Sequence, residues 1–304
     1  MATGSVGEFE MQRSRMFGLA YRLLGSAEEA EDVVQDAFLR WSGANHAAIV
    51  APSAWLARVV TNLCLNRLTS ARVQREQYIG PWLPGPVLTA DGALGPLDTA
   101  EQRDSVSLAL LVLMERLTPT ERAVFVLREA FGYSYQAIAQ ILPRSETNCR
   151  QIHRRARRRL DEKRPRFHVN TGHWHELVQR FLAAAQEGDL HRLEQLLAAD
   201  VTWWSDGGGK VTAGRCPVTG RSRVARLLTG LFSKFAGGME IAVAEVNGEP
   251  AILGWDGEHL YGVLVLEVVD GQIGALRAVV NPDKLRFAAR QAERVSHLGG
   301  FAGS

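Results

Sequence analysis

Cysteine is scarce in this chain of 304 residues, and its spacing excludes two kinds of site. Cys64, Cys149 and Cys216 stand far apart, so no two have the close spacing of metal ligands and no set resembles a disulfide framework. Free thiols are typical of proteins in a reducing compartment. We therefore expect no metal site, no cofactor and no disulfide bond.

Long apolar runs are also missing. The first residues, MATGSVGEFEMQRSRMF, lack the apolar core of a signal peptide, and no stretch of 18 apolar residues occurs anywhere. Neither sign of charge dominates, because 35 Lys and Arg oppose 33 Asp and Glu. These absences predict a soluble, cytoplasmic protein with no membrane partner. The length suits two domains of ordinary size.

Basic charge is instead concentrated in one segment. Between Arg144 and Arg166 ten Lys and Arg stand against three acids. This segment follows a short stretch of helical periodicity that starts at Ser134, and the break Leu142-Pro143-Arg144-Ser145 separates the two. Two short helices across a tight turn, the second one basic, are typical of a helix-turn-helix that enters the DNA major groove. The alternative is a solvated basic helix on the surface.

The first turns of such a second helix carry the side chains that reach base edges or phosphates. We predict these contacts for Arg144, Ser145, Asn148, Arg150, Gln151 and Arg154. His153 is expected to contact phosphate or to pack, rather than to act as a pH switch.

The remaining periodicity divides the chain into segments. Residues 8–76 are predicted to be all-helical, with Ser26 capping one helix and Pro52 starting another. Residues 77–104 hold four prolines and four glycines, which predict an interdomain linker anchored by Trp82. A third helical block covers 105–166, and Thr118-Pro119-Thr120-Glu121 is a helix start within it.

The pattern of predicted secondary structure changes at His173. Two helices, the strand VTWWSD, a Gly-rich turn and a further helix precede four strand-like runs, which Asn247-Gly248, Asp256-Gly257 and Asp270-Gly271 separate. Such dipeptides are strong hairpin signals, so we predict an antiparallel sheet in an α+β domain over 173–285. A tail, 286–304, follows, and a helix is expected from Pro282 to about His297.

Residues 8–164 resemble a bacterial RNA polymerase sigma factor of the extracytoplasmic-function group. The run EEAEDVVQDAFLRW (28–41) is similar to the polymerase-docking helix of region 2, and PSAWLARVVTNLCLNRLTSARVQRE to the helix that reads the −10 element. The helix-turn-helix resembles region 4, which reads the −35 element. The resemblance implies a multidomain protein with two all-α sigma domains, a region 2 helical bundle and a region 4 helix-turn-helix, that binds core RNA polymerase and promoter DNA. A sigma factor is not itself an enzyme, so no catalytic residue is expected.

The docking helix needs an acidic face and aromatic anchors, and residues 28–41 offer both. Asp32, Gln35 and Asp36 lie within about one turn, with Phe38 and Trp41 nearby. The alternative for the two aromatic residues is a place in the core.

A melted −10 strand needs polar side chains that pair with an unstacked base and arginines for its phosphates. We assign these roles to Asn62, Asn66, Arg67, Arg72 and Arg75. The alternative for each Asn is an ordinary cap or surface role. Many relatives carry Asp where this chain has Asn66, so its base preference stays open.

Residues from His173 onward resemble the SnoaL-like cone fold of ketosteroid isomerases. WLPGP (82–86), DGGGK (206–210) and NPDKL (281–285) are similar to motifs of the sigma subfamily with a fused SnoaL-like extension, although Gly85 replaces a common Glu. The resemblance implies that this domain regulates the sigma domains in cis by an intramolecular contact. The residues assigned to this role are Trp82, Asp206, Gly207, Gly208, Gly209, Lys210, Asn281, Pro282, Asp283, Lys284 and Leu285.

Three alternatives remain open from the sequence. DGGGK is also consistent with a plain hairpin turn. The cone domain offers Trp203, Trp204, Trp255 and Tyr261, beside Asp206 and Asn281, as lining of a pocket, so it could be catalytic or bind an unknown small ligand that switches transcription. Finally, the helix-turn-helix could belong to a regulator that never touches polymerase, although residues 28–41 argue against this.

Overall fold

The computed structural model describes residues 2–95, 97, 99–161, 174–235 and 238–297. It contains two compact units, each discussed by itself. Unit 1 comprises residues 1–77 and 91–164, and unit 2 comprises residues 78–90 and 165–304. The predicted linker 77–104 is therefore shared, because residues 78–90 belong to unit 2 and the remainder to unit 1. We call residues 78–90 the strap.

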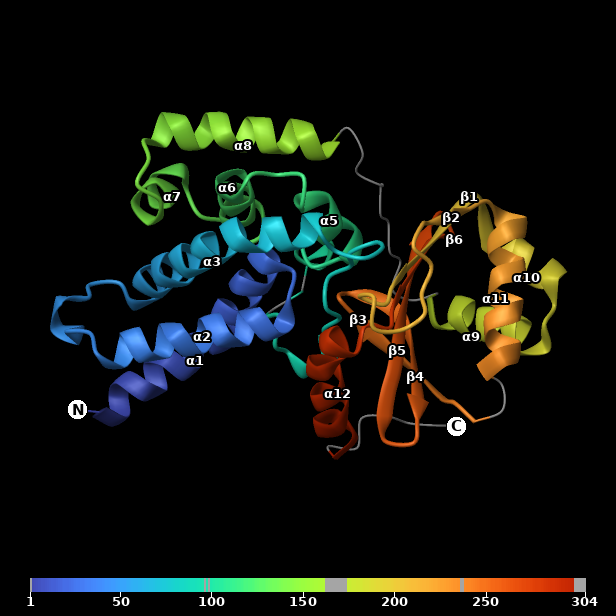
Figure 1. Cartoon of the computed structure of the whole chain (residues 1–304). Coiled ribbons are helices and arrows are strands. Elements are labelled where there is room, and N and C mark those ends of the chain that lie inside the picture. The colour runs from blue at the N-terminus through green and yellow to red at the C-terminus, as the bar shows by residue number, and fades with distance from the viewer. Residues whose placement is uncertain (1, 96, 98, 162–173, 236–237, 298–304) are drawn as a thin grey trace. The chain divides into compact units, whose positions relative to one another are not determined.

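Unit 1 is all-helical (Figure 1). Its first half holds α1 (Ala2–Leu24), α2 (Ala27–Ser42) and α3 (Pro52–Glu76), which pack against one another around Tyr21, Trp41 and Leu56. Ser26 caps α2 by accepting a hydrogen bond from the Glu29 amide, as the sequence predicts.

The second half of unit 1 holds α4 (Ala100–Asp104), α5 (Leu108–Met114), α6 (Pro119–Glu129), α7 (Tyr135–Ile141) and α8 (Glu146–Asp161). Thr118 and Glu121 form the capping box expected at the start of α6. A buried arginine links the two halves, because Arg122 on α6 donates to the Arg22 carbonyl at the end of α1 at 3.2 Å.

Unit 2 is an α+β fold built on one six-stranded sheet. The strands are β1 (Leu197–Asp206), β2 (Val218–Thr219), β3 (Glu240–Val246), β4 (Glu249–Asp256), β5 (His259–Val269) and β6 (Gln272–Val279), in the order β2-β1-β6-β5-β4-β3. All neighbours are antiparallel except β1 and β6, which run parallel. The sheet is thus mixed rather than antiparallel throughout, since the first strand joins the last across the long intervening chain.

Helices cover both faces of this sheet (Figure 1). One face packs on α9 (Trp174–Glu187), α10 (Leu190–Leu196) and α11 (Arg221–Phe235) through a core that includes Phe181, Trp203 and Leu276. On the other face α12 (Pro282–His297) contacts β5. Two of the predicted hairpin turns have both residues at positive φ, Asn247-Gly248 and Asp270-Gly271, as a type I′ turn requires.

Candidate nucleic-acid interface and regulatory cluster

The basic helix α8 presents two different faces. Its apolar residues Cys149, Ile152, Ala156 and Leu160 are buried, and the helix packs on α6 and α7. The arginines between them, Arg150, 154, 155, 157, 158 and 159, are all exposed. This amphipathic division fixes the helix by its apolar side and leaves a row of cations for an anionic partner.

The predicted −35 residues lie at or just before the first turns of α8, and they differ in exposure and in the contacts of their side chains. Arg144, Ser145, Arg150, Gln151 and Arg154 are exposed, whereas Asn148 is half-buried. The Ser145 hydroxyl accepts a hydrogen bond from the Asn148 amide at 3.2 Å, so it caps the helix. Arg150 pairs with Glu146 at 2.5 Å and lies 5.4 Å from the centre of the Tyr135 ring. Arg154 makes no recorded ion pair among the described residues.

His153 is a packing residue in this structure. It is buried, its Nε2 lies 2.8 Å from a Glu129 carboxylate oxygen, and its Nδ1 lies 3.0 Å from the Tyr135 hydroxyl. These contacts join α6, the start of α7 and α8, which fixes the angle of the helix-turn-helix.

The predicted −10 residues lie on α3. Asn66 is exposed, while Asn62 and Arg67 are half-buried. The side chains of Arg72 and Arg75 lie outside the described residues. Arg67 pairs with Asp36 at 2.9 Å and with Asp32 at 3.6 Å, so this predicted DNA contact is joined to the acidic face of α2.

The acidic face of α2 exposes a different apolar side chain from the predicted ones. Asp32 and Gln35 are exposed, Asp36 is half-buried, and Leu39, one turn further on, is 63% exposed. Trp41 was expected to dock, but it is 1% exposed and packs against Trp55 and His46. Phe38 is half-buried beside Phe9. Trp41, predicted as an aromatic anchor, is therefore part of the bundle core, and Leu39 is the exposed apolar side chain on this face.

A second site, in unit 2, is built around the Asp206 carboxylate at the end of β1. Asp206 is 1% exposed and accepts four hydrogen bonds. The Tyr78 hydroxyl (2.5 Å) and the Gly208 amide (3.0 Å) donate to Oδ1. The Leu83 amide (2.8 Å) and Lys284 Nζ (2.7 Å) donate to Oδ2. Every acceptor position of the carboxylate is thus used, which compensates its burial.

Lys284 completes this Asp206 cluster, which we define as Tyr78, Trp82, Asp206, Asn281 and Lys284. The Lys284 ammonium also donates to the Leu83 carbonyl at 2.6 Å and lies 4.5 Å from the centre of the Trp82 ring and 4.6 Å from that of Tyr78. Asn281 donates to the Tyr78 hydroxyl at 2.8 Å. Burial, and then the hydrogen bond to Asp206, raise the pKa of Tyr78 above its ordinary value.

The strap has a second anchor at its other end. The Val87 backbone N–H donates to the side-chain Oδ1 of Asn247 at 3.0 Å, and the Asn247 backbone N–H donates to the Val87 carbonyl at 2.9 Å. Leu88 forms an isolated antiparallel bridge with Val246, and its backbone amide donates to Gln291 Oε1 at 2.8 Å. The apolar residues Leu83, Val87 and Leu88 are buried. The strap therefore packs as part of unit 2, and its WLPGP motif contacts residues of DGGGK and NPDKL.

The glycine-rich loop, residues 207–209, is packed against the strap and Asn281. Gly208 has φ of +60°, and a Cβ there would lie 2.2 Å from Asn281 Nδ2. A Cβ on Gly209 would lie 2.8 Å from Ile79 of the strap. Lys210, which follows, pairs with Asp283 at the start of α12, and this pair is exposed. Pro282 begins α12, and Leu285 in the first turn of this helix is buried.

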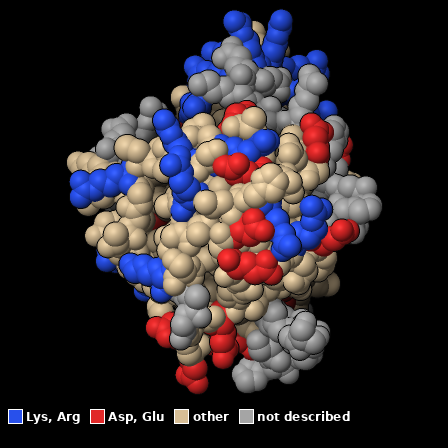
Figure 2. All heavy atoms as spheres, turned by 90° about the vertical axis from the view of Figure 1, so that its right-hand side faces the viewer, with Lys and Arg blue, Asp and Glu red and all other residues tan. Residues whose placement is uncertain are grey.

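The proposed lining of a cone pocket does not assemble as one site. Trp203 lies in the core between the sheet and α9–α11, whereas Asp206 and Asn281 belong to the Asp206 cluster. Trp204, Trp255 and Tyr261 are half-buried. Figure 2 views the α10–α11 side of unit 2, and it shows basic and acidic side chains interspersed rather than a surface of one charge.

Sequence reasoning missed several residues of these sites. Tyr78, Asn247 and Gln291 hold the strap, yet each stands more than 120 positions from a partner. Only Leu39 carried a local signal, since it follows Asp32, Gln35 and Asp36 on one helical face. None of the described helices has the length and apolar character needed to cross a bilayer.

Three family models match the chain. Sigma-70 region 2 covers residues 9–73, sigma-70 region 4 covers 107–160, and the SnoaL-like domain covers 178–275. Similar proteins include the "ECF RNA polymerase sigma factor SigJ" of Mycobacterium tuberculosis (strain ATCC 25618 / H37Rv), 36% identical over 97% of both chains. The "Probable ECF RNA polymerase sigma factor SigI" of M. tuberculosis (strain CDC 1551 / Oshkosh) is 35% identical over 90% of this chain and 92% of its own.

A solved structure agrees with this likeness. The crystal structure of M. tuberculosis extracytoplasmic function sigma factor SigJ matches with a TM-score of 0.71 and 33% identity, over 93% of this chain and 98% of that one. The resemblance expected from the motifs is thus confirmed along nearly the full length, including the α+β unit that follows region 4. The chain belongs to the extracytoplasmic-function RNA polymerase sigma factors, in the form that carries a C-terminal SnoaL-like domain.

Proposed function

We propose that this sigma factor binds core RNA polymerase through the exposed face of α2, reads the −10 element with α3 and the −35 element with α8, and is regulated in cis by unit 2 through the strap. Sigma factors are not enzymes, so the reaction is the polymerase's. The observation that carries the regulatory part is the strap, because the segment between region 2 and region 4 is built into the cone unit.

The docking surface is Asp32, Gln35, Asp36 and Leu39, which we call the α2 face. An exposed leucine beside two carboxylates suits a partner with a basic rim and an apolar pocket. Arg67 is held by both carboxylates, at 2.9 and 3.6 Å. A basic polymerase surface would compete for these carboxylates and free Arg67 for DNA phosphate, which couples docking to promoter contact.

Geometry supports regulation by opening. The −10 and −35 elements are centred about 25 base pairs apart, or about 85 Å along B-form DNA. A compact unit of about 150 residues has a radius of gyration of about 15 Å. Unit 1 in its compact form therefore does not reach both elements, so α3 and α8 must separate before they contact them together.

The strap decides how far they separate, because it joins α3 to α4. Its 13 residues, if extended, span about 45 Å. While the Asp206 cluster and Gln291 hold the strap in unit 2, these 13 residues cannot extend the connection between α3 and α4. We therefore propose that unit 2 is inhibitory and that strap release is the activating step.

The experiment measures polymerase binding and strap release in the full chain. Fluorescence anisotropy with core polymerase should give saturable binding. Hydrogen exchange should then show that the Leu83, Val87 and Leu88 amides lose protection in the complex with polymerase and promoter. Saturable binding with unchanged strap protection would contradict the regulatory part alone, and absence of binding would contradict the whole proposal.

The alternative of a small-ligand or catalytic cone domain is not favoured by any observation. Phe181, Trp203 and Leu276 pack in the space between the sheet and α9–α11. The alternative of a regulator that never touches polymerase does not fit the match to sigma-70 region 2 over residues 9–73.

A further inference from the structure

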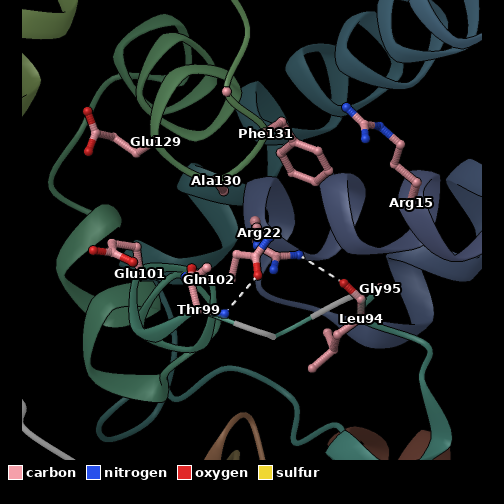
Figure 3. Close-up of a pocket in the computed structure, with 11 residues that line it drawn as sticks. Arg15, Arg22, Leu94, Gly95, Thr99, Glu101, Gln102, Glu129, Ala130 and Phe131 are labelled. Carbon is pink, nitrogen blue, oxygen red and sulfur yellow. Dashed lines mark hydrogen bonds between the residues drawn. The ribbon is translucent and has the colours of Figure 1, made fainter.

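A cavity of about 360 Å³ lies inside unit 1, away from the surfaces assigned above. Three parts of unit 1 line it: α1 with Arg15 and Arg22, the turn after α6 with Phe131, and a third group formed by Leu94, Gly95, Thr99, Glu101 and Gln102 (Figure 3). The volume is in the range of small-molecule sites. Nothing in the polymerase or promoter assignments uses this cavity.

Arg22 brings an uncompensated charge to the cavity. Its side chain is buried, and its donors meet only neutral acceptors: Nε donates to Ser105 Oγ at 2.9 Å, and Nη1 donates to the carbonyls of Gly18 and Leu94 at 2.9 and 3.3 Å. Within the described part of the chain, no carboxylate pairs with Arg22 and Nη2 has no hydrogen-bond partner. Burial lowers the pKa of Arg22 to about 10, so the group stays charged at neutral pH. A buried cation without a counter-charge is costly, and a bound anion would remove that cost.

A second arginine adds to this positive field. Arg15 lies 5.4 Å and Arg22 lies 5.3 Å from the centre of the Phe131 ring, so two guanidinium groups share one aromatic wall. Glu101 and Glu129 also line the cavity, but Figure 3 shows their carboxylates directed away from Arg22. Glu129 is also engaged by His153 at 2.8 Å. The interior near Arg22 is therefore cationic.

We propose that this cavity binds the oxyanion of a small molecule, a phosphoryl or carboxylate group, held by Arg22 and Arg15. The bound group would take the free Nη2 donor of Arg22, and Phe131 would contact its apolar part. Because α1, the start of α4 and the turn after α6 all line the site, binding stabilises the compact form of unit 1. An inhibitory effect on transcription would follow, and this consequence alone rests on the proposed opening.

Binding is tested by isothermal titration calorimetry of the full chain with inorganic phosphate and, separately, with succinate, at constant ionic strength. We expect saturable binding of at least one probe at one site, and the tighter probe identifies the group. Arg15→Gln should weaken binding about tenfold, the loss of one charge-assisted hydrogen bond, and Arg22→Met should abolish it. Arg13→Gln is the matched control, because Arg13 is an exposed α1 arginine paired with Glu10 outside the cavity.

The proposal would be overturned if neither probe saturates on the wild-type chain. It would equally be overturned if Arg15→Gln and Arg13→Gln bind alike, since Arg15 is exposed and its replacement does not threaten the fold. Arg22→Met replaces a buried group, so circular dichroism must show that this variant is folded. If Arg22→Met unfolds, the comparison of Arg15→Gln with Arg13→Gln alone tests the proposal. None of these measurements involves polymerase, so their failure would leave the proposed sigma function intact.

Discussion

Leu39 and Trp41 lie two positions apart on α2, but they differ in burial. Leu39 is 63% exposed, whereas Trp41 is 1% exposed in the bundle core. Sequence composition favours the aromatic residue as an anchor, but only packing decides which side of α2 faces solvent. An apolar side chain beside Asp32 and Asp36 is therefore the better candidate for a contact with polymerase.

This assignment predicts the effect of Leu39→Asp. The substitution should weaken binding of core polymerase at least about tenfold, because a charge replaces an anchor at the centre of the interface. Stability should change by no more than about 0.5 kcal/mol, as is usual for an exposed position. Anisotropy with labelled protein measures the affinity. Leu190→Asp, an exposed leucine on α10, is the control, and equal affinity of the two variants would exclude Leu39 from the docking surface.

The Asp206 cluster predicts a large difference between two neighbouring ion pairs. Asp206→Asn leaves Lys284, whose side chain is 15% exposed, without its counter-charge, which should cost about 3–5 kcal/mol. Asp283→Asn breaks the exposed pair with Lys210 and should cost less than about 1 kcal/mol. Urea unfolding of the full chain compares them. Similar losses in both variants would mean that the strap is not held by Asp206.

Tyr78 adds a dependence on high pH. Burial and the hydrogen bond to Asp206 raise the pKa of its hydroxyl above the ordinary value of about 10. The unfolded chain then loses this proton at lower pH than the folded chain, so the stabilisation is complete below about pH 10 and is lost as pH rises toward the folded pKa. We expect the free energy of unfolding to fall more steeply above about pH 10 in wild type than in Tyr78→Phe. Parallel pH profiles would refute a protected Tyr78 hydroxyl.

At the scale of elements, the helix-turn-helix is the best example of local encoding. Its boundaries follow from a cap and a break within a few residues, the Ser134 cap and the Leu142–Ser145 break, and the Thr118 capping box likewise starts the preceding helix α6. Periodicity likewise located β1, α11 and the hairpins of β3–β6. Each of these signals lies within about ten positions of the element that it predicts.

The strap is the opposite case. Four prolines and four glycines in 77–104 predict an irregular segment, and much of it is irregular, but composition says nothing about what it packs on. Its partners, Asp206, Asn247 and Gln291, are supplied by strand ends and a helix far along the chain. Family motifs placed Trp82, Asp206 and Lys284 in one regulatory set, yet Tyr78 lies outside every motif and needed the structure.

Helix α8 predicts a specific salt dependence. Arg154→Ala should weaken promoter DNA binding by the polymerase complex, and a phosphate contact should reduce the slope of log K against log salt by about 0.9. A base contact should instead cost roughly 1–3 kcal/mol at one −35 position. Arg192→Ala, an exposed arginine on α10, serves as the comparison. If the two variants bind promoter DNA alike, α8 does not read DNA through Arg154.

At the scale of the whole molecule, the proposed contacts and the proposed regulation belong to different units. Unit 1 carries the α2 face, α3 and α8, and unit 2 holds the segment that connects α3 to α4. Removing unit 2 by truncation would expose the buried strap residues Leu83, Val87 and Leu88. Point variants that loosen the strap but keep unit 2 are therefore the cleaner way to test regulation in cis.

The most direct test is run-off transcription with core polymerase on a template that carries the −10 and −35 elements. The full chain is compared with Asp206→Asn/Lys284→Met, which removes both buried charges, and with Lys210→Met/Asp283→Asn, which removes the exposed pair. Hydrogen exchange must show that the strap amides lose protection only in the first variant. The account predicts a promoter-dependent transcript whose yield rises several-fold in the first variant and is unchanged in the second. A loosened strap with wild-type or lower yield would contradict inhibition through the strap, and absence of any promoter-dependent transcript would contradict the function itself.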